Sequence, residues 1–211
     1  MNYLVNGVKV AANVYTPAGY DEKSDNKYPA VTIAHPNGGV KEQVSGLFAQ
    51  KLAENGYIAI ACDAAYQGAS EGEPRNTDIP TNRGEDIHAM VDYLMTYPGV
   101  DIERIGLFGI CGGGGYTLKA AQLEKRVKAV ATLSAFNTGI VHLFGLGNSQ
   151  ADTIQQRLKE ASDARTEEAR TGKVVYPAPR GQITQEYIDS LPDGLYKDGM
   201  YYYGRDYAHP N

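Results

Sequence analysis

Short apolar runs alternate with stretches in which hydrophobic residues recur every three or four positions. Residues 8–15 alternate apolar and polar side chains, which is the period of a half-exposed strand. Residues 29–34 and 57–62 are short apolar runs, typical of strands that are buried on both faces of a parallel sheet. Residues 127–133 form another such run. These segments predict strands of one sheet.

Between these predicted strands, apolar residues recur with the spacing of an α-helix. A first set of apolar residues lies on one face of a predicted helix and consists of Val44, Leu47, Phe48 and Leu52. This helix is expected to end at Gly56, because glycine is suited to the position after a helix. The second set follows a capping pair, Asn82 and Glu85, and consists of Ile87, Met90, Val91 and Leu94. From residue 29 onward strands and helices alternate. This order predicts an α/β protein, a three-layer α/β/α sandwich with a mostly parallel sheet and right-handed crossovers.

The stretch RIGLFGICGGGGY, residues 104–116, combines a buried strand, a sharp turn and the start of a helix. Its turn centres on Cys111, and Gly109 and Gly113 stand two residues away on either side. A side chain pushed out at a strained strand-to-helix turn needs such small neighbours, so the pattern predicts a nucleophile elbow. The helix N-terminus favours a thiolate. The N–H of Gly112 is then a candidate donor to an oxyanion on the attacked carbonyl.

Other interpretations of these glycines fit less well. A phosphate-binding P-loop requires Gly-Lys-Ser/Thr, which does not follow. A dinucleotide site requires an acidic residue after the next strand, but Ser134, Ala135 and Phe136 follow it. A flavodoxin-like nucleotide or flavin binder and a buried structural cysteine at position 111 remain open alternatives.

Composition narrows the classes of partner and cofactor. The 211 residues carry a net charge of −5 without a basic run, which argues against nucleic acid. No apolar stretch is long enough to span a membrane, and the N-terminus lacks the form of a signal peptide. Cys62 and Cys111 fall in different strand regions, so we expect free thiols in a reducing cytoplasm. Asp63, Glu71 and Glu73 lack a His or Cys partner for a metal, so a solvated loop is expected there, and no cofactor is predicted.

The pattern of apolar and polar residues changes after the last predicted strand, residues 127–133. We expect an α/β core over residues 1–137 and a cap-like or lid-like helical and irregular segment over residues 138–211, within one domain overall. Residues 139–147 are apolar and rich in glycine, whereas residues 151–173 are helical but highly polar. A helix so polar usually lies over a surface or covers an opening.

Three stretches, residues 35–43 (HPNGGVKEQ), residues 63–75 and residues 101–104 leading into the elbow, resemble the α/β-hydrolase superfamily. Within it the chain is similar to the dienelactone-hydrolase-like branch with a cysteine nucleophile, including bacterial hydrolases related to polyketide transferases and to X-Pro peptidase catalytic domains. The resemblance implies a hydrolase of ester, lactone or thioester carbonyls, or an acyl or ketide transferase, acting on a small-molecule acyl substrate.

The resemblance also assigns roles to individual residues. It makes Cys111 the nucleophile and pairs the backbone amide of Gly112 with an amide from the loop after the strand at residues 29–34. Pro36 has no N–H, so Asn37 is the candidate for that second donor. His35 is expected to shape the loop through hydrogen bonds to backbone. Candidate substrate contacts are Tyr66, Tyr116 and, secondarily, His35.

The sequence departs from the family after residue 133. A hydrolase triad continues from nucleophile to acid to histidine, but only His142 and His209 follow, and neither comes after a strand and an acidic loop. Four or five strands are predicted, against the family's usual eight. The chain therefore resembles a C-terminally truncated hydrolase with impaired turnover. The alternative is a non-catalytic binding or interaction module, and self-association through the edge strand 127–133 or the apolar segment 139–146 is expected in either case.

Overall fold

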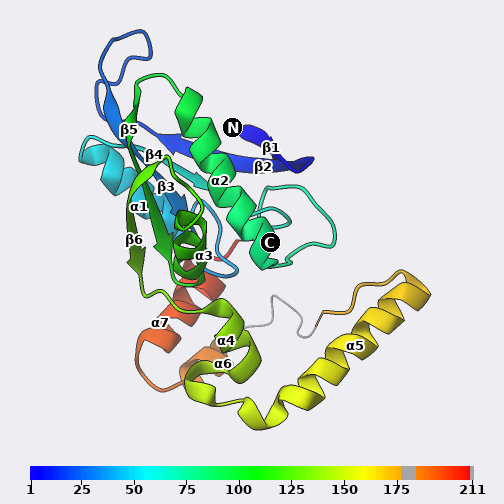
Figure 1. Ribbon diagram of the computed structural model, residues 1–211. Helices are drawn as coiled ribbons and strands as arrows, with labels where there is room; N and C mark the ends of the chain where they lie inside the picture. Colours follow the sequence, from blue (N-terminus) through cyan, green and yellow to red (C-terminus); the bar gives the residue numbers. More distant parts are fainter. Residues whose placement is uncertain (177–183, 210–211) are drawn as a thin grey trace. The chain divides into compact units, whose positions relative to one another are not determined.

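The computed structural model describes residues 1–176 and 184–209 (Figure 1). Its centre is a six-stranded sheet in the order β1-β2-β4-β3-β5-β6. The strands are β1 (Asn2–Val5), β2 (Val8–Tyr15), β3 (Tyr28–Ala34), β4 (Ile58–Cys62), β5 (Val100–Ile110) and β6 (Val127–Leu133). β4, β3, β5 and β6 are parallel to one another, whereas β1 and β2 form an antiparallel hairpin and β2 runs antiparallel to β4. The predicted mostly parallel sheet is confirmed.

Helices cover both faces of this sheet (Figure 1). α2 (Pro80–Thr96) and α3 (Gly112–Ala121) contribute to one buried cluster, and α1 (Val44–Glu54) contributes to the other. The two clusters separate because successive side chains of a strand point to opposite faces. In β4, for example, Ile58 and Ile60 pack with α2, while Ala59 and Ala61 pack with α1. The three-layer α/β/α arrangement is therefore also confirmed.

The register of the strands places the segments that follow β3, β5 and β6 at the same end of the sheet, the carboxyl ends of these strands. Ala34 of β3 is paired with Gly109 of β5, and Ile110 of β5 with Leu133 of β6. The loops that follow these parallel strands emerge side by side, which is where open α/β sheets build their sites. The loop that follows β3, residues 35–43, begins with His35 and Pro36 and is called the His-Pro loop below. This loop and the elbow at Cys111, about 75 residues apart in sequence, are brought together in this way.

Residues 1–136 form one compact unit, and the described residues from 137 to 209 form a second. The second unit contains α4 (Thr138–Phe144), η1 (Leu146–Asn148), η2 (Ala151–Thr153), α5 (Ile154–Thr171), α6 (Gln185–Ser190), α7 (Leu195–Tyr201) and the π-helical turn η3 (Tyr202–Asp206). No residue of α5 is buried, in agreement with its polar pattern. Its anchor is Arg157, whose guanidinium donates to the carbonyls of His142, Leu143 and Gln150.

Some details differ from the sequence prediction. α2 begins at Pro80 rather than at the expected Asn82, because proline is well suited to the first helical position. Leu47 of α1 is exposed, although its spacing had placed it on the buried stripe. β1 was not expected, and it is stabilised by pairing with β2. Within the described ranges, no helix has both the length and the hydropathy required to cross a membrane.

Candidate active site

Cys111 lies at the turn between β5 and α3, where the elbow was expected. Its backbone is in an unusual conformation for a residue with a side chain, with φ 84° and ψ −115°. Such a conformation is strained and persists where the surrounding structure enforces it. Here the Cys111 amide donates to the Leu133 carbonyl of β6 at 2.9 Å, while the Cys111 carbonyl accepts from the amide of Gly114. The thiol is free and partly exposed.

The glycines around Cys111 are required by close contacts. A Cβ on Gly109 would lie 2.4 Å from the hydroxyl of Thr117, and one on Gly113 would lie 2.4 Å from the carbonyl oxygen of His35. A Cβ on Gly112 would collide with the side-chain oxygen of Asn37. Backbone atoms leave room only for glycine at positions 109 and 113, whereas at position 112 the obstacle is the Asn37 side chain. These glycines let β5, α3 and the His-Pro loop approach one another closely enough to bring Asn37 against the start of α3.

His35 shapes the loop after β3. Its Nε2 accepts a hydrogen bond from the Ala64 amide at 3.0 Å, so the proton is on Nδ1, which donates to the Pro36 carbonyl at 2.7 Å. Burial and the neighbouring Arg83 guanidinium hold the pKa of His35 well below its usual value. The ring is neutral, 1% exposed and bonded to backbone on both sides. A substrate contact through it would require these bonds to break.

Asn37 and Gly112 lie next to each other, because the Asn37 side-chain oxygen occupies the space where a side chain on residue 112 would begin. The first amides of a helix have no partner within the helix and point away from its N-terminus. The Gly112 amide is one of these. The structure thus brings together three residues that the sequence had selected, namely Cys111, Asn37 and Gly112.

Asp78 and Arg83 belong to the same site and were missed by sequence reasoning. Asp78 accepts hydrogen bonds from the Asn37 side-chain amide and, at 3.2 Å, from the Tyr116 hydroxyl. Arg83 lies 3.6 Å from Asp78, donates to the His35 carbonyl at 2.5 Å and packs over the Tyr116 ring at 5.3 Å. The available signal was a charged residue, Arg83, in helical spacing four residues before Ile87 of the buried stripe.

The predicted tyrosine contacts have different environments. Tyr116 is 5% exposed, and its hydroxyl is committed to Asp78. Tyr66 has a positive φ of 71° in the loop after β4, and its ring packs against Gly72, where a Cβ would lie 2.4 Å away. Their role in substrate binding remains a prediction.

The expected solvated loop around Asp63 is only partly correct. Glu71 and Glu73 are exposed, but Asp63 is fully buried. Its carboxylate accepts from the amide and the ammonium group of Lys41 at 2.7 and 2.8 Å, and from the Ala69 amide at 2.8 Å. Asp63 therefore ties the loop after β4 to the His-Pro loop, which is a structural role. Within residues 1–176 and 184–209, no group of three or more His, Cys, Asp or Glu side chains could hold a metal ion.

Residues 1–136 contain two histidines, and both are engaged elsewhere. His35 is bonded to backbone, and His88 on α2 pairs with Glu124 at 3.0 Å. Arg126 and His88 hold the pKa of Glu124 down at about 2. His142 lies on α4, and His209 lies near the end of the second unit. The two histidines of residues 1–136 are therefore held by partners other than Cys111.

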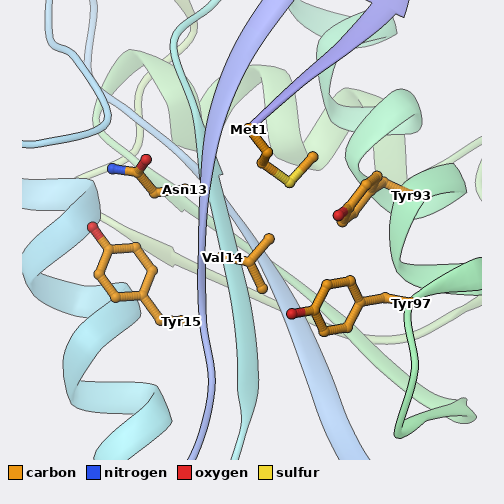
Figure 2. Close-up of a pocket in the computed structure, with 6 residues that line it drawn as sticks. All are labelled: Met1, Asn13, Val14, Tyr15, Tyr93 and Tyr97. Carbon is orange, nitrogen blue, oxygen red and sulfur yellow. The ribbon is translucent and has the colours of Figure 1, made fainter. Parts of the chain in front are cut away.

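One hollow beside α2 lies away from the elbow. A cavity of about 470 Å³ is lined by Met1, Asn13, Val14, Tyr15, Tyr93 and Tyr97. Figure 2 shows Asn13 and Tyr15 on one side of β2 and Val14 on the other, facing Tyr93 and Tyr97. It is an open notch at the sheet edge, where β2 continues past the first residue of β1. Tyr97 follows α2, roughly 20 Å along the helix from Arg83. The notch is therefore remote from Cys111.

The elbow, the His-Pro loop and the order of elements match a known family. The model of the dienelactone hydrolase family matches residues 11–137, which is more than half of the chain. The chain belongs to the dienelactone hydrolase family. The matched range includes both β3 with its His-Pro loop and β5 with the elbow.

Individual relatives agree with this assignment. The Escherichia coli (strain K12) protein YcjY is 45% identical over 167 residues, which are 79% of this chain and 54% of YcjY. The crystal structure of Pseudomonas aeruginosa PA2218 superposes with a TM-score of 0.79 at 35% identity, covering 90% of this chain and 60% of that one. The polyketide transferase grgF of Penicillium sp is 30% identical over 119 residues, 56% of this chain and 40% of grgF. The chain spans about half the length of the curated relatives that it matches.

Proposed function

We propose that Cys111 is the nucleophile of an acyl-transfer site for esters, lactones or thioesters of small molecules. The observation that carries the proposal is the strained Cys111 backbone, held with Asn37 packed against Gly112. The sulfur, as thiolate, would form a bond to the carbonyl carbon while the carbonyl π electrons move to oxygen. The amides of Gly112 and Asn37 would stabilise that oxyanion. Collapse would expel the leaving group and leave an acyl thioester on Cys111.

The second half of the reaction would be slow in the first unit by itself. Release of the acyl group to water or another acceptor needs a base to remove the acceptor's proton, and a positioned base contributes about 10²- to 10⁴-fold. His35 and His88 are both engaged by other partners. We therefore propose that the acyl thioester accumulates. Transfer of an acyl or ketide group to an acceptor other than water is the same chemistry with a different second step.

The occupied histidines also favour a second candidate function, a non-catalytic binding module on a hydrolase scaffold. The two candidates differ in whether a covalent bond forms at Cys111. A module of this kind would bind acyl compounds reversibly, and its sulfur would carry no acyl group.

A burst experiment separates the two. The chain is mixed with p-nitrophenyl acetate in excess, and p-nitrophenolate release is followed by absorbance. We expect one equivalent to be released per chain, followed by a much slower steady phase. Cys111→Ala should abolish the burst, whereas Cys62→Ala, the matched change at the buried thiol, should retain it. Absence of a burst in the unaltered chain would contradict the acyl-transfer proposal and favour the binding module.

A further inference from the structure

We propose that Asp78 is a positioning residue that holds Asn37 in the geometry required for oxyanion binding; this rests on the acyl-transfer function proposed above. Asp78 stands outside every motif that identifies the family in the sequence. It lies two residues before α2, in the polar segment between β4 and α2. Its side chain is 16% exposed, and every partner of its carboxylate belongs to a segment bordering the site.

The contact with Asn37 has a defined direction. An ionised carboxylate can only accept hydrogen bonds, so the Asn37 group facing Asp78 is its NH₂. This leaves the Asn37 Oδ1 atom directed at the start of α3, where it blocks any side chain on Gly112. The Oδ1 atom is buried, and no described residue donates a hydrogen bond to it. The bond to Asp78 is thus what fixes the orientation of the Asn37 side chain, and with it the backbone on which the second amide donor lies.

The remaining partners of Asp78 fix its own position. Tyr116, which donates to the same carboxylate oxygen, lies on α3 four residues after Gly112. Arg83, on the first turns of α2, faces the other oxygen at 3.6 Å and supplies a compensating positive charge. One carboxylate therefore joins α2, α3 and the His-Pro loop. An oxyanion hole is effective when its donors are fixed before the reaction, and this triangle of contacts provides that rigidity.

The test compares two reactions of the same sulfur. Acetylation by p-nitrophenyl acetate passes through an oxyanion, whereas alkylation by iodoacetamide displaces iodide from an sp³ carbon and forms none. The ratio of the two second-order rate constants isolates the oxyanion contribution from thiol reactivity and from folding. We expect Asp78→Ala to lower this ratio about tenfold to a hundredfold. The decrease should not exceed the decrease in rate caused by removing one hydrogen-bond donor of an oxyanion hole. Asp78→Glu should restore part of the ratio.

A double-mutant cycle identifies the route of the effect. Asn37→Ala keeps the backbone amide but removes the side chain that donates a hydrogen bond to Asp78, so it should lower the ratio as Asp78→Ala does. In the Asn37→Ala background, Asp78→Ala should cause no further loss, since both changes break the same link. The matched control is Asp92→Asn, an exposed carboxylate on α2 that pairs with Arg126. It should leave both rate constants unchanged.

The outcomes are distinguishable. A parallel fall of acetylation and alkylation in Asp78→Ala, an unchanged ratio, or additive losses in the double variant would each overturn the positioning role. Should Asp78→Ala fail to fold, the same ratio of rate constants is measured on Asp78→Asn, which keeps the size of the side chain and removes its charge. An unaltered chain that is alkylated at Cys111 but never acetylated overturns the acyl-transfer function, and the positioning role with it.

Discussion

The two ends of the parallel sheet differ in how their space is used. At the carboxyl ends of the strands, polar side chains are buried against glycines that leave no room for a Cβ, as at Gly112 and Gly113. At the amino ends, an open notch of about 470 Å³ is lined largely by tyrosines, and Gly56 has nothing within 4 Å of a built Cβ. Empty volume thus lies at one end and preorganised polar contacts lie at the other. In this molecule the candidate active site is marked by polar contacts that are already in place, not by a large empty cavity.

The largest expected effect is on folding and tests the close packing at the carboxyl ends. Gly113→Ala would place a methyl group 2.4 Å from the His35 carbonyl oxygen and 2.5 Å from that of Ala34. Backbone cannot yield as a side-chain tip can, so the free energy of unfolding should fall by about 3 kcal/mol or more. Gly84→Ala on α2 meets nothing within 4 Å and should raise it by about 0.5–1 kcal/mol. Urea denaturation of both variants measures the contrast; equal effects would contradict it.

The two cysteines provide the next comparison. Cys62 is 3% exposed, and burial raises the pKa of its thiol, whereas the Cys111 thiol is partly exposed at the turn. Only the thiolate reacts, so iodoacetamide should label Cys111 at least about a hundredfold faster than Cys62. Peptide mass spectrometry after timed quenching measures both rates in one sample. Comparable rates would show that the turn does not present Cys111 to solvent.

A smaller effect concerns the dependence of stability on pH. Burial raises the pKa of Asp86 from 3.8 to about 6. The folded carboxyl therefore retains its proton over a range in which the unfolded one has lost it. Asp86 should make the free energy of unfolding fall, by at most about 2–3 kcal/mol, as the pH rises from about 4 to 6.

Asp86→Asn isolates this contribution. The amide oxygen can still accept the bond from the Ala65 amide, but the group no longer titrates. The slope of stability against pH between about 4 and 6 should become more positive in the variant. Glu124→Gln serves as a control, because the pKa of Glu124 is lowered from 4.5 to about 2 and its contribution is lost at lower pH. An unchanged slope in Asp86→Asn would contradict the raised pKa.

A weaker effect is expected at the edge of the sheet. β6 pairs with β5, and all its residues from Lys128 to Leu133 are exposed in the structure. An uncovered, apolar edge strand favours self-association. We propose weak, concentration-dependent dimerisation, which Val130→Lys should reduce. Multi-angle light scattering measures it, and a monomer at the highest attainable concentration would contradict it.

The smallest expected effect is at the tyrosine-lined notch. Tyr97→Ala enlarges a hollow that is roughly 20 Å along α2 from Arg83. The acetylation rate of Cys111 should therefore remain unchanged. A marked decrease, with alkylation unaffected, would show that the two ends of the sheet are coupled.

Sequence reasoning reached the sheet and the elbow because both depend on local pattern. Strand and helix periods, the small residues around Cys111 and the missing N–H of Pro36 are visible without coordinates. Asp78 was not found, since its importance arises from contacts with three other segments that no local pattern encodes. Arg83 had a local signal, a charge on the buried face of a helix, but that signal does not reveal its partners. The burial of Asp63 was missed for the same reason: its partner Lys41 lies on another loop. The segment 177–183 lies outside the described residues.

The identity of the acylated atom is the most direct test of the nucleophile. After brief exposure of the chain to p-nitrophenyl acetate, acid quenching and proteolysis should yield an acetyl group on the peptide that contains Cys111. The thioester should be removed by hydroxylamine at neutral pH. Acetyl groups confined to lysines or to the N-terminus, with an unmodified Cys111 peptide, would contradict nucleophilic catalysis by this sulfur.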